Sequence, residues 1–283
     1  MSPAETPKTT APEPDEIFAR TREEGRRRLG RSRLELSSTA LVAGFDVVFG
    51  VIALVTIATA LTPRVGEEAA HAIGALGFGI AFIFIVVGRS ELFTENFLVP
   101  VLGLSRGWIT KVKLAELWIL SPVLNIVGGT VLVLILSVDG VLPEGSDKTI
   151  SSIAEHFAGL GPLTAFCSAI VGGALITVMT WLIEAVGTSG GRILCAWIGG
   201  VLLTLGSFNH VIVVTLELIF GMRMGADVSG LDVAQNFAIA VAGNMVGGLL
   251  FVTLTRTGQA IGASDEGDGA EVPGEASEQA GER

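Results

Sequence analysis

Residues 69–96 read AAHAIGALGFGIAFIFIVVGRSELFTEN. The part up to residue 87 is apolar, and it is long enough to cross a hydrocarbon core of about 30 Å as a helix. The apolar run stops at GRSELFTEN, where charged side chains follow at a depth at which they are costly. We therefore predict a membrane-spanning helix that is interrupted at residues 88–96.

Other apolar segments of similar length occur along the chain. They cover residues 38–61, 114–137, 161–184, 192–221 and 233–255. The segment 192–221 is too long for one plain helix and contains GSFNH at 206–210, which predicts a second break. Non-helical backbone at membrane depth is tolerated only where protein buries it or where it lines a water-filled cavity. Breaks at corresponding positions of two halves indicate a transport site.

The composition supports a membrane protein. Hydrophobic residues make up 50% of the chain and charged residues 16%, and the mean hydropathy is +0.65; this is too apolar for an ordinary soluble domain. The net charge of −10 and the lack of a basic, aromatic-rich pattern argue against a nucleic-acid partner. Cys167 and Cys195 lie in apolar segments without metal-ligand spacing. The sequence therefore predicts no metal site and no cofactor.

The chain divides into three regions. Residues 1–37 form a polar tail whose Arg-rich stretch Ile17–Leu36 is either a helix on the membrane surface or a charged juxtamembrane tail. Residues 38–256 form the transmembrane domain, and residues 257–283 form an acidic tail that we expect to be disordered. If both termini are cytoplasmic, most Lys and Arg residues fall on the cytoplasmic side of the membrane. Because cytoplasmic loops collect Lys and Arg, this distribution supports six spans with that orientation.

A short signature occurs twice. Asn125 opens NIVGG in the third segment, and Asn244 opens NMVGG in the sixth. Three segments per half place the second half upside down relative to the first, although small residues also recur in spans for packing alone. The expected fold is all-α, with six transmembrane helices in an inverted 3+3 repeat and with helices 2 and 5 broken.

The string RSELFTEN at 89–96 resembles the (G/A)-(A/S)-E-L-F-T-x-N signature of the formate/nitrite transporter family. Asn209-His210, the NMVGG of the sixth segment and Ala43-Gly44-Phe45 lie where similar family elements lie, so that the resemblance covers about residues 38–256. It implies an aquaporin-like protomer in a homopentamer of the inner membrane, with one pore per protomer. Such proteins pass small monovalent anions, such as formate or nitrite, together with protons.

The resemblance also implies roles for particular residues. Thr94 would lie on the first break beside the pore and face His210. Asn209 would stand next to His210, and the positions that match the family's apolar constrictions are Phe78, Phe82, Leu92 and Leu203. A bare anion is costly in an apolar constriction and a neutral acid is much less so. His210 is the expected proton donor, because imidazole changes charge near neutral pH.

The break departs from the family pattern in its charges. Arg89 stands where the family has a small residue, and Glu91 and Glu95 follow it. Arg89 either pairs with these carboxylates or faces the vestibule and attracts anions. Lys148 is the nearest candidate for the family's vestibule lysine, and Ser168 stands in place of a pore asparagine.

Three other functions are open alternatives to weak-acid anion transport with protons. A neutral-solute channel of aquaporin type is one, although neither half carries an Asn-Pro-Ala box. A membrane enzyme would need clustered ionisable groups, whereas Asp46, Glu116, Glu184 and Glu217 are scattered. The third alternative is a transport-inactive scaffold whose tails bind a partner. We expect a transporter in the lipid bilayer and not an enzyme.

Overall fold

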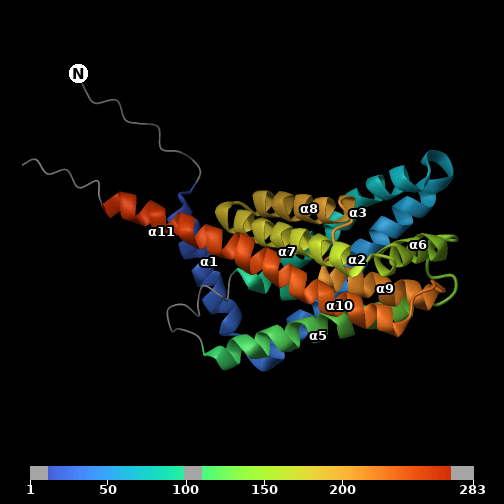
Figure 1. Cartoon of the computed structure of the whole chain (residues 1–283), viewed down its shortest axis with the longest axis horizontal. Coiled ribbons are helices and arrows are strands. Elements are labelled where there is room, and N and C mark those ends of the chain that lie inside the picture. The colour runs from blue at the N-terminus through green and yellow to red at the C-terminus, as the bar shows by residue number, and fades with distance from the viewer. Residues whose placement is uncertain (1–11, 99–109, 269–283) are drawn as a thin grey trace, which may run out of the picture.

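The computed structural model describes residues 12–98 and 110–268, and all regular structure in these ranges is helical. The helices form an elongated bundle, with α1 (Pro14–Leu29) and α11 (Leu254–Asp268) at one end and α6 (Ser146–Ala158) at the other (Figure 1). We call these the α1 end and the α6 end. The outermost tails, residues 1–11 and 269–283, lie outside the described ranges.

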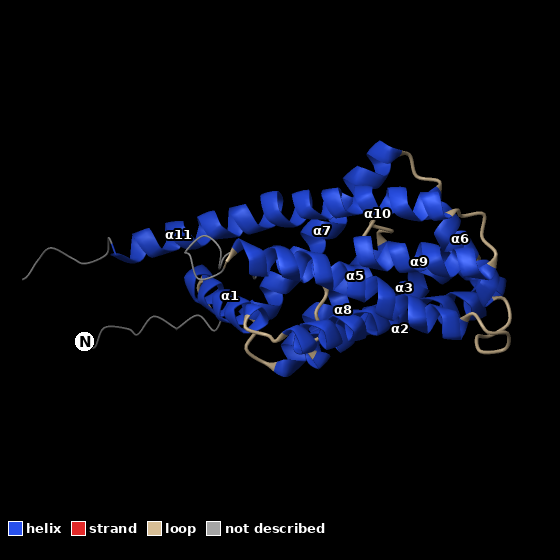
Figure 2. Cartoon of the chain, turned by 90° about the horizontal axis from the view of Figure 1, so that it is seen from below, coloured by secondary structure: helices blue, strands red, loops and turns tan. Residues whose placement is uncertain are grey.

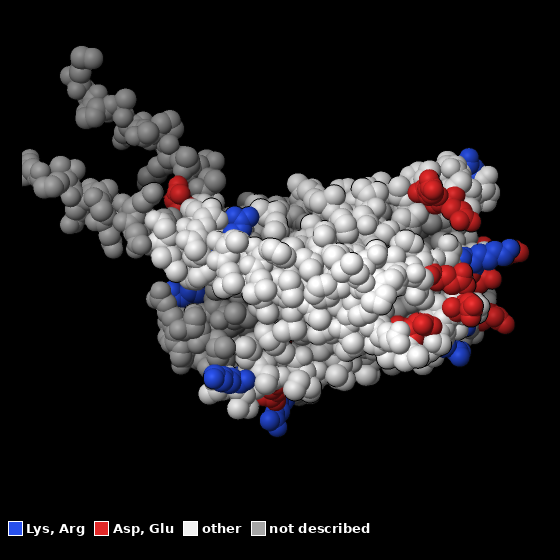
Figure 3. All heavy atoms as spheres, viewed as in Figure 1, with Lys and Arg blue, Asp and Glu red and all other residues white. Residues whose placement is uncertain are grey.

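Within residues 12–98 and 110–268, five helices are long and apolar enough to span a membrane. They are α2 (Arg33–Val65), α3 (Glu67–Gly88), α5 (Lys111–Leu136), α7 (Pro162–Ala185) and the rod Gly230–Gly262. They correspond to the first four predicted segments and to the sixth. Figure 3 shows charged side chains gathered toward the two ends, with an uncharged surface between them. This is the surface that a bilayer requires.

The predicted fifth segment consists of two shorter helices, α8 (Ser189–Leu205) and α9 (Val211–Met224). Between them, Gly206 follows the last turn of α8, and Ser207 has a left-handed backbone with φ 46°. His210 then caps α9, because its Nδ1 accepts a hydrogen bond from the amide of Val213 at 3.4 Å. The predicted break at 206–210 is confirmed.

The first break begins one residue later than predicted. Helix α3 ends at Gly88, and Arg89 adopts a left-handed backbone with φ 56°, which a non-glycine residue seldom does inside a regular element. A single 3₁₀ turn, η1 (Phe93–Phe97), follows. The α-helix is therefore interrupted as predicted, although part of the break is a tight turn and not an open loop.

Two helix crossings allow no side chain at the contact. A Cβ on Gly44 of α2 would lie 2.0 Å from the carbonyl oxygen of Asn125 on α5. A Cβ on Gly173 of α7 would lie 2.3 Å from the carbonyl oxygen of Asn244 on α10 (Gly230–Met245). Glycine is required at both positions because the backbones themselves are in contact.

Three parts of the structure differ from the sequence prediction. The Arg-rich stretch splits: α1 ends at Leu29, and it lies at the end of the bundle beside α11 (Figures 1 and 2). The amphipathic helix α6 was not predicted. Residues 257–268, expected to be disordered, continue the rod beyond the π-helical stretch η2 (Val246–Thr253) as α11. The reason is packing, since α11 contacts α1 and its Ala260 is only 3% exposed.

Candidate functional site

The two breaks meet inside the bundle. Thr94 Oγ1 lies 2.7 Å from His210 Nε2, and both residues are fully buried. Since Nδ1 of the same ring accepts the amide of Val213, the neutral ring carries its proton on Nε2 and donates it to the hydroxyl of Thr94. The structure thus brings together the two residues that the sequence predicted as neighbours.

Apolar side chains surround this pair. The ring of Phe82 stands edge-on to His210, with 6.3 Å between the ring centroids, and Phe78 stands edge-on to Phe82 at 6.2 Å. Leu92 is fully buried, and Leu203 is 1% exposed. These are the four side chains predicted as constrictions, and all of them lie in the interior. Water is poorly accommodated by such surroundings, which strengthens any hydrogen bond that a solute makes with Thr94 or His210.

Asn125 holds the first break in place. Its Oδ1 accepts the amide of Phe93 at 3.0 Å, and its Nδ2 donates to the carbonyls of Ala40 at 2.8 Å and Glu91 at 2.9 Å. The side chain of Asn125 on α5 therefore links the backbone of Glu91 and Phe93, which flank Leu92, to the backbone of α2. Backbone groups that leave the helix at this depth are thereby satisfied.

Asn244 makes the same three hydrogen bonds in the second half. Its Oδ1 accepts the amide of Val211 at 2.9 Å, and its Nδ2 donates to the carbonyls of Ala169 at 2.7 Å and Asn209 at 2.9 Å. The backbone on both sides of His210 is thus tied to α7. The two predicted repeat asparagines have equivalent partners.

The side chain of Asn209 belongs to this scaffold. Its Nδ2 donates to Oδ1 of Asn236 at 2.8 Å, and its backbone amide donates to Oγ of Ser168 at 2.9 Å. The side-chain amide that was predicted beside His210 as a pore residue is therefore occupied by Asn236 on α10 and by the carbonyl of Ala165 on α7, to which Nδ2 donates at 3.3 Å.

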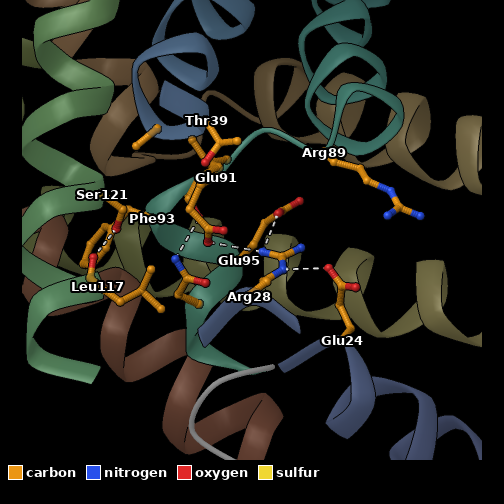
Figure 4. A network of polar contacts seen from close by, with 12 residues as sticks. Glu24, Arg28, Thr39, Arg89, Glu91, Phe93, Glu95, Leu117 and Ser121 are labelled. Carbon is orange, nitrogen blue, oxygen red and sulfur yellow. Dashed lines mark hydrogen bonds and ion pairs between the residues drawn. The ribbon is translucent and has the colours of Figure 1, made fainter. Parts of the chain in front are cut away.

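The buried carboxylates of the first break are neutralised by the N-terminal region (Figure 4). Nη1 of Arg28 donates to Oε2 of Glu95 at 2.9 Å and lies 3.5 Å from Oε1 of Glu91. Arg31 pairs with the other oxygen of Glu91. Glu91 and Glu95 are 0% and 3% exposed. Without these guanidinium groups, two uncompensated charges would be buried.

The pairing of Arg89 with Glu91 or Glu95 is therefore wrong. The left-handed backbone at Arg89 turns its exposed side chain away from both carboxylates (Figure 4). The sequence did carry a signal for the true partners, because two acids at membrane depth require counter-charges and the Arg-rich stretch is the largest local supply. Sequence reasoning missed Arg28 and Arg31 because their contact partners lie some 60 positions further along the chain.

The side chains of α1 that take part in this network are charged. Burial alone would lower the pKa of Arg28, but the carboxylates of Glu95 and Glu91 hold this pKa above its ordinary value. Burial likewise would raise the pKa of Glu24, but hydrogen bonds and charges from Arg27 and Arg28 lower it to about 2. Arg28 and Glu24 are therefore both charged at neutral pH.

Two neighbouring cavities lie toward the α6 end in the described part of the chain. The larger, of about 290 Å³, is lined by residues of α2, α3 and α6, among them Lys148 and His71. The smaller, of about 20 Å³, shares His71 and Ile153 with it and reaches Leu203. In the described ranges, no group of three or more His, Cys, Asp and Glu side chains is placed to hold a metal ion.

Comparison with known proteins gives a consistent result. Residues 15–257 match the family model described as "Formate/nitrite transporter". The chain is 25% identical to the inner membrane protein YfdC of Escherichia coli over 86% of this chain and 77% of that protein. It is also 25% identical to the formate channel BtFdhC of Bacillus thuringiensis, over 84% and 92% of the two chains.

Solved structures share the fold. An "FNT family ion channel" superposes with a TM-score of 0.75 at 19% identity, over 84% of this chain and 96% of that one. A "pentameric formate channel with formate bound" superposes with a TM-score of 0.65 at 19% identity, over 78% and 95%.

Proposed function

The chain belongs to the formate/nitrite transporter family, and we propose that it lets small monovalent weak-acid anions, such as formate or nitrite, cross a membrane together with protons. The family consists of transporters and channels, so the chain is not an enzyme. The observation that carries the proposal is the hydrogen bond between Thr94 and His210 where the two helix breaks meet. In the described ranges, no other buried hydrogen bond between side chains joins the two breaks directly.

The chemistry follows from where this pair lies. An anion that enters the apolar surroundings of Phe82 and Leu92 loses its water, and the cost is far lower if it is protonated. The donor is the imidazolium form, which His210 reaches by taking up a second proton from water of the pathway. It then gives its Nε2 proton to the substrate, directly or through the hydroxyl of Thr94, and returns to the neutral ring. The substrate continues as a neutral acid and releases this proton to water on leaving.

We further propose the assembly in which this pathway works: six spans in an inverted 3+3 repeat, both termini in the cytoplasm, and a homopentamer in the inner membrane. The equivalent hydrogen bonds of Asn125 and Asn244 support the repeat. The similarity to a pentameric formate channel supports the pentamer. The E. coli relative's name supports the location. Native mass spectrometry in mild detergent tests the oligomer, and a stable monomer or trimer would count against it.

The test of function uses purified protein in liposomes with a pH dye inside. Formate, nitrite, acetate, lactate, hydrosulfide and glycerol are presented in turn. We expect flux of one or more anions with a change in internal pH. Flux of glycerol without anion flux would favour the alternative of a neutral-solute channel, and no flux at all would favour a scaffold.

His210 variants test the mechanism. His210→Asn keeps a side-chain acceptor for the cap of α9 but cannot titrate, so its flux should lose its dependence on pH between about 5 and 8. His210→Phe should abolish anion flux. The matched control is His156→Asn on the exposed side of α6, which should behave as wild type. If His210→Phe assembles normally and transports at the wild-type rate and pH dependence, the mechanism is wrong.

A further inference from the structure

Glu217 is a buried carboxyl group that the site described above does not use. It lies on α9 and is 3% exposed. None of the described residues donates a hydrogen bond to its carboxyl oxygens or forms an ion pair with them. An ionised carboxylate without a partner is costly to bury, whereas a protonated carboxyl can be held there and can donate its O–H.

The carboxyl group faces a space, not closely packed protein. Glu217 lines the cavity of about 20 Å³ together with Thr204 and Phe208, which is room for about one water molecule. Because His71 and Ile153 are walls of both cavities, this small space adjoins the cavity of about 290 Å³ at the α6 end. Glu217 therefore lies on the side of the bundle's centre that faces the larger cavity.

Glu217 is also in register with His210. His210 is the cap that precedes α9, and Glu217 lies seven positions after it, about two helical turns, so the two residues lie on similar sides of the helix and about 10 Å apart along its axis. Val213 and Val214, which lie between them, line the same small cavity, and so does Leu203. The order along this face is therefore Glu217 on the α6 side, then apolar side chains, then His210.

We propose that Glu217 is a proton-exchanging residue on the α6 side of the transport pathway. The inference rests on the proposed function. An anion that arrives from the larger cavity receives the proton of Glu217: the carboxyl O–H bond breaks, and an O–H bond forms on the anion. The neutral acid passes Leu203 and reaches Thr94 and His210 already protonated, so that the proton of His210 serves anions that arrive from the α1 side. The carboxylate left behind takes a proton from water of the α6-side cavity, so that one proton accompanies each anion.

The other titratable groups around α9 do not share this position. His71 is the other one in the wall of the small cavity, where its Nε2 donates to the carbonyl of Thr204 at 3.3 Å. The groups on the elements packed against α9 do not line that cavity: Asp147, Lys148, Glu155 and His156 on α6; Lys111, Lys113 and Glu116 on α5; Arg33, Glu35, Asp46 and Arg64 on α2; Asp232 on α10.

The test is formate flux into liposomes from pH 5 to 8 with Glu217→Gln, which keeps the size and hydrogen bonding of the side chain but cannot exchange a proton. We expect a loss of flux of at least about tenfold with a changed pH profile, and Glu217→Asp should restore part of the flux and the pH dependence. The matched control is Glu68→Gln, an exposed carboxyl at the same end of the bundle. Thermal stability and oligomeric state are measured in parallel.

The outcomes separate the two levels of inference. If Glu217→Gln matches wild type in flux and pH profile, the role of Glu217 is refuted and the proposed function stands. Loss of flux together with lower stability, without rescue by Glu217→Asp, would mean that Glu217 is only structural and would also refute the role. A wild-type protein that carries no anion would refute the proposed function and the role of Glu217 with it.

Discussion

Replacing Asn244 with Asp is the sharpest test of how the second break is held. The two side chains have the same shape, and an Asp still accepts the amide of Val211. It loses the Nδ2 donor, however, on which the carbonyls of Ala169 and Asn209 depend. Each buried carbonyl left without a donor costs about 1–3 kcal/mol. The expected loss of stability is therefore about 2–6 kcal/mol when the Asp is ionised. It is at least about 1 kcal/mol when the Asp is protonated, since one O–H serves one carbonyl.

The assay is thermal unfolding of the purified protein in detergent, followed by anion flux in liposomes. We expect a lower unfolding midpoint for Asn244→Asp and reduced flux, because His210 lies between the two backbone groups that Asn244 ties to α7. The matched control is Gln235→Glu, the same amide-to-acid change at an exposed position on the same helix. It should change the midpoint little.

An unchanged midpoint and unchanged flux for Asn244→Asp would refute this reasoning. That result would mean that the three hydrogen bonds do not define the position of the break. The second half would then need another explanation for its non-helical backbone at membrane depth.

The remaining predictions concern α1 and one helix crossing. Arg28→Met should destabilise the protein by about 3–5 kcal/mol, because it leaves Glu95 buried without its partner; an unfolding midpoint like that of wild type would contradict this. Gly44→Ala should cost at least about 1–3 kcal/mol and lower the yield of folded protein, since its Cβ would overlap the carbonyl of Asn125; normal yield and stability would show that the crossing can widen. Ionised Glu24 stabilises docked α1, because its pKa is lower in the folded protein than its ordinary value of 4.5. This contribution is complete above pH 4.5 and is lost as the pH falls toward about 2. Hydrogen exchange of α1 amides should accordingly rise relative to the bundle below pH 4.5, and constant relative protection down to pH 2 would argue against it.

The transmembrane segments and both breaks could be predicted because each produces a local pattern. A long apolar run identifies a span, and a cluster such as GSFNH inside one identifies an interruption. The neighbouring positions of Thr94 and His210 were predicted from the repeat and the family resemblance together, and the contact confirms that prediction. Their role in transport stays a prediction.

Other features depend on contacts that no local pattern defines. The partners of Glu91 and Glu95 lie on a separate helix, and Arg89, adjacent in sequence, is turned away by its own backbone. Helix α11 forms although its composition is typical of a disordered tail, because a packed neighbour stabilises it. Helix α6 was missed because its buried residues are interspersed with charged ones, even though their spacing is that of an amphipathic helix.

The π-helical stretch Val246–Thr253 determines which face of the following helix, α11, is turned toward α1. One residue more or less in a helix turns the continuation by about 100° about its axis, and a π turn accommodates such an extra residue without ending the rod. Here Thr253 secures the wide turn, because its single O–H is shared between the carbonyls of Gly248 at 2.9 Å and Phe97 at 3.0 Å. The loss of a single codon in this stretch would therefore leave a helix of nearly the same length, yet rotate a different face of α11 toward α1 and uncouple the two ends of the chain.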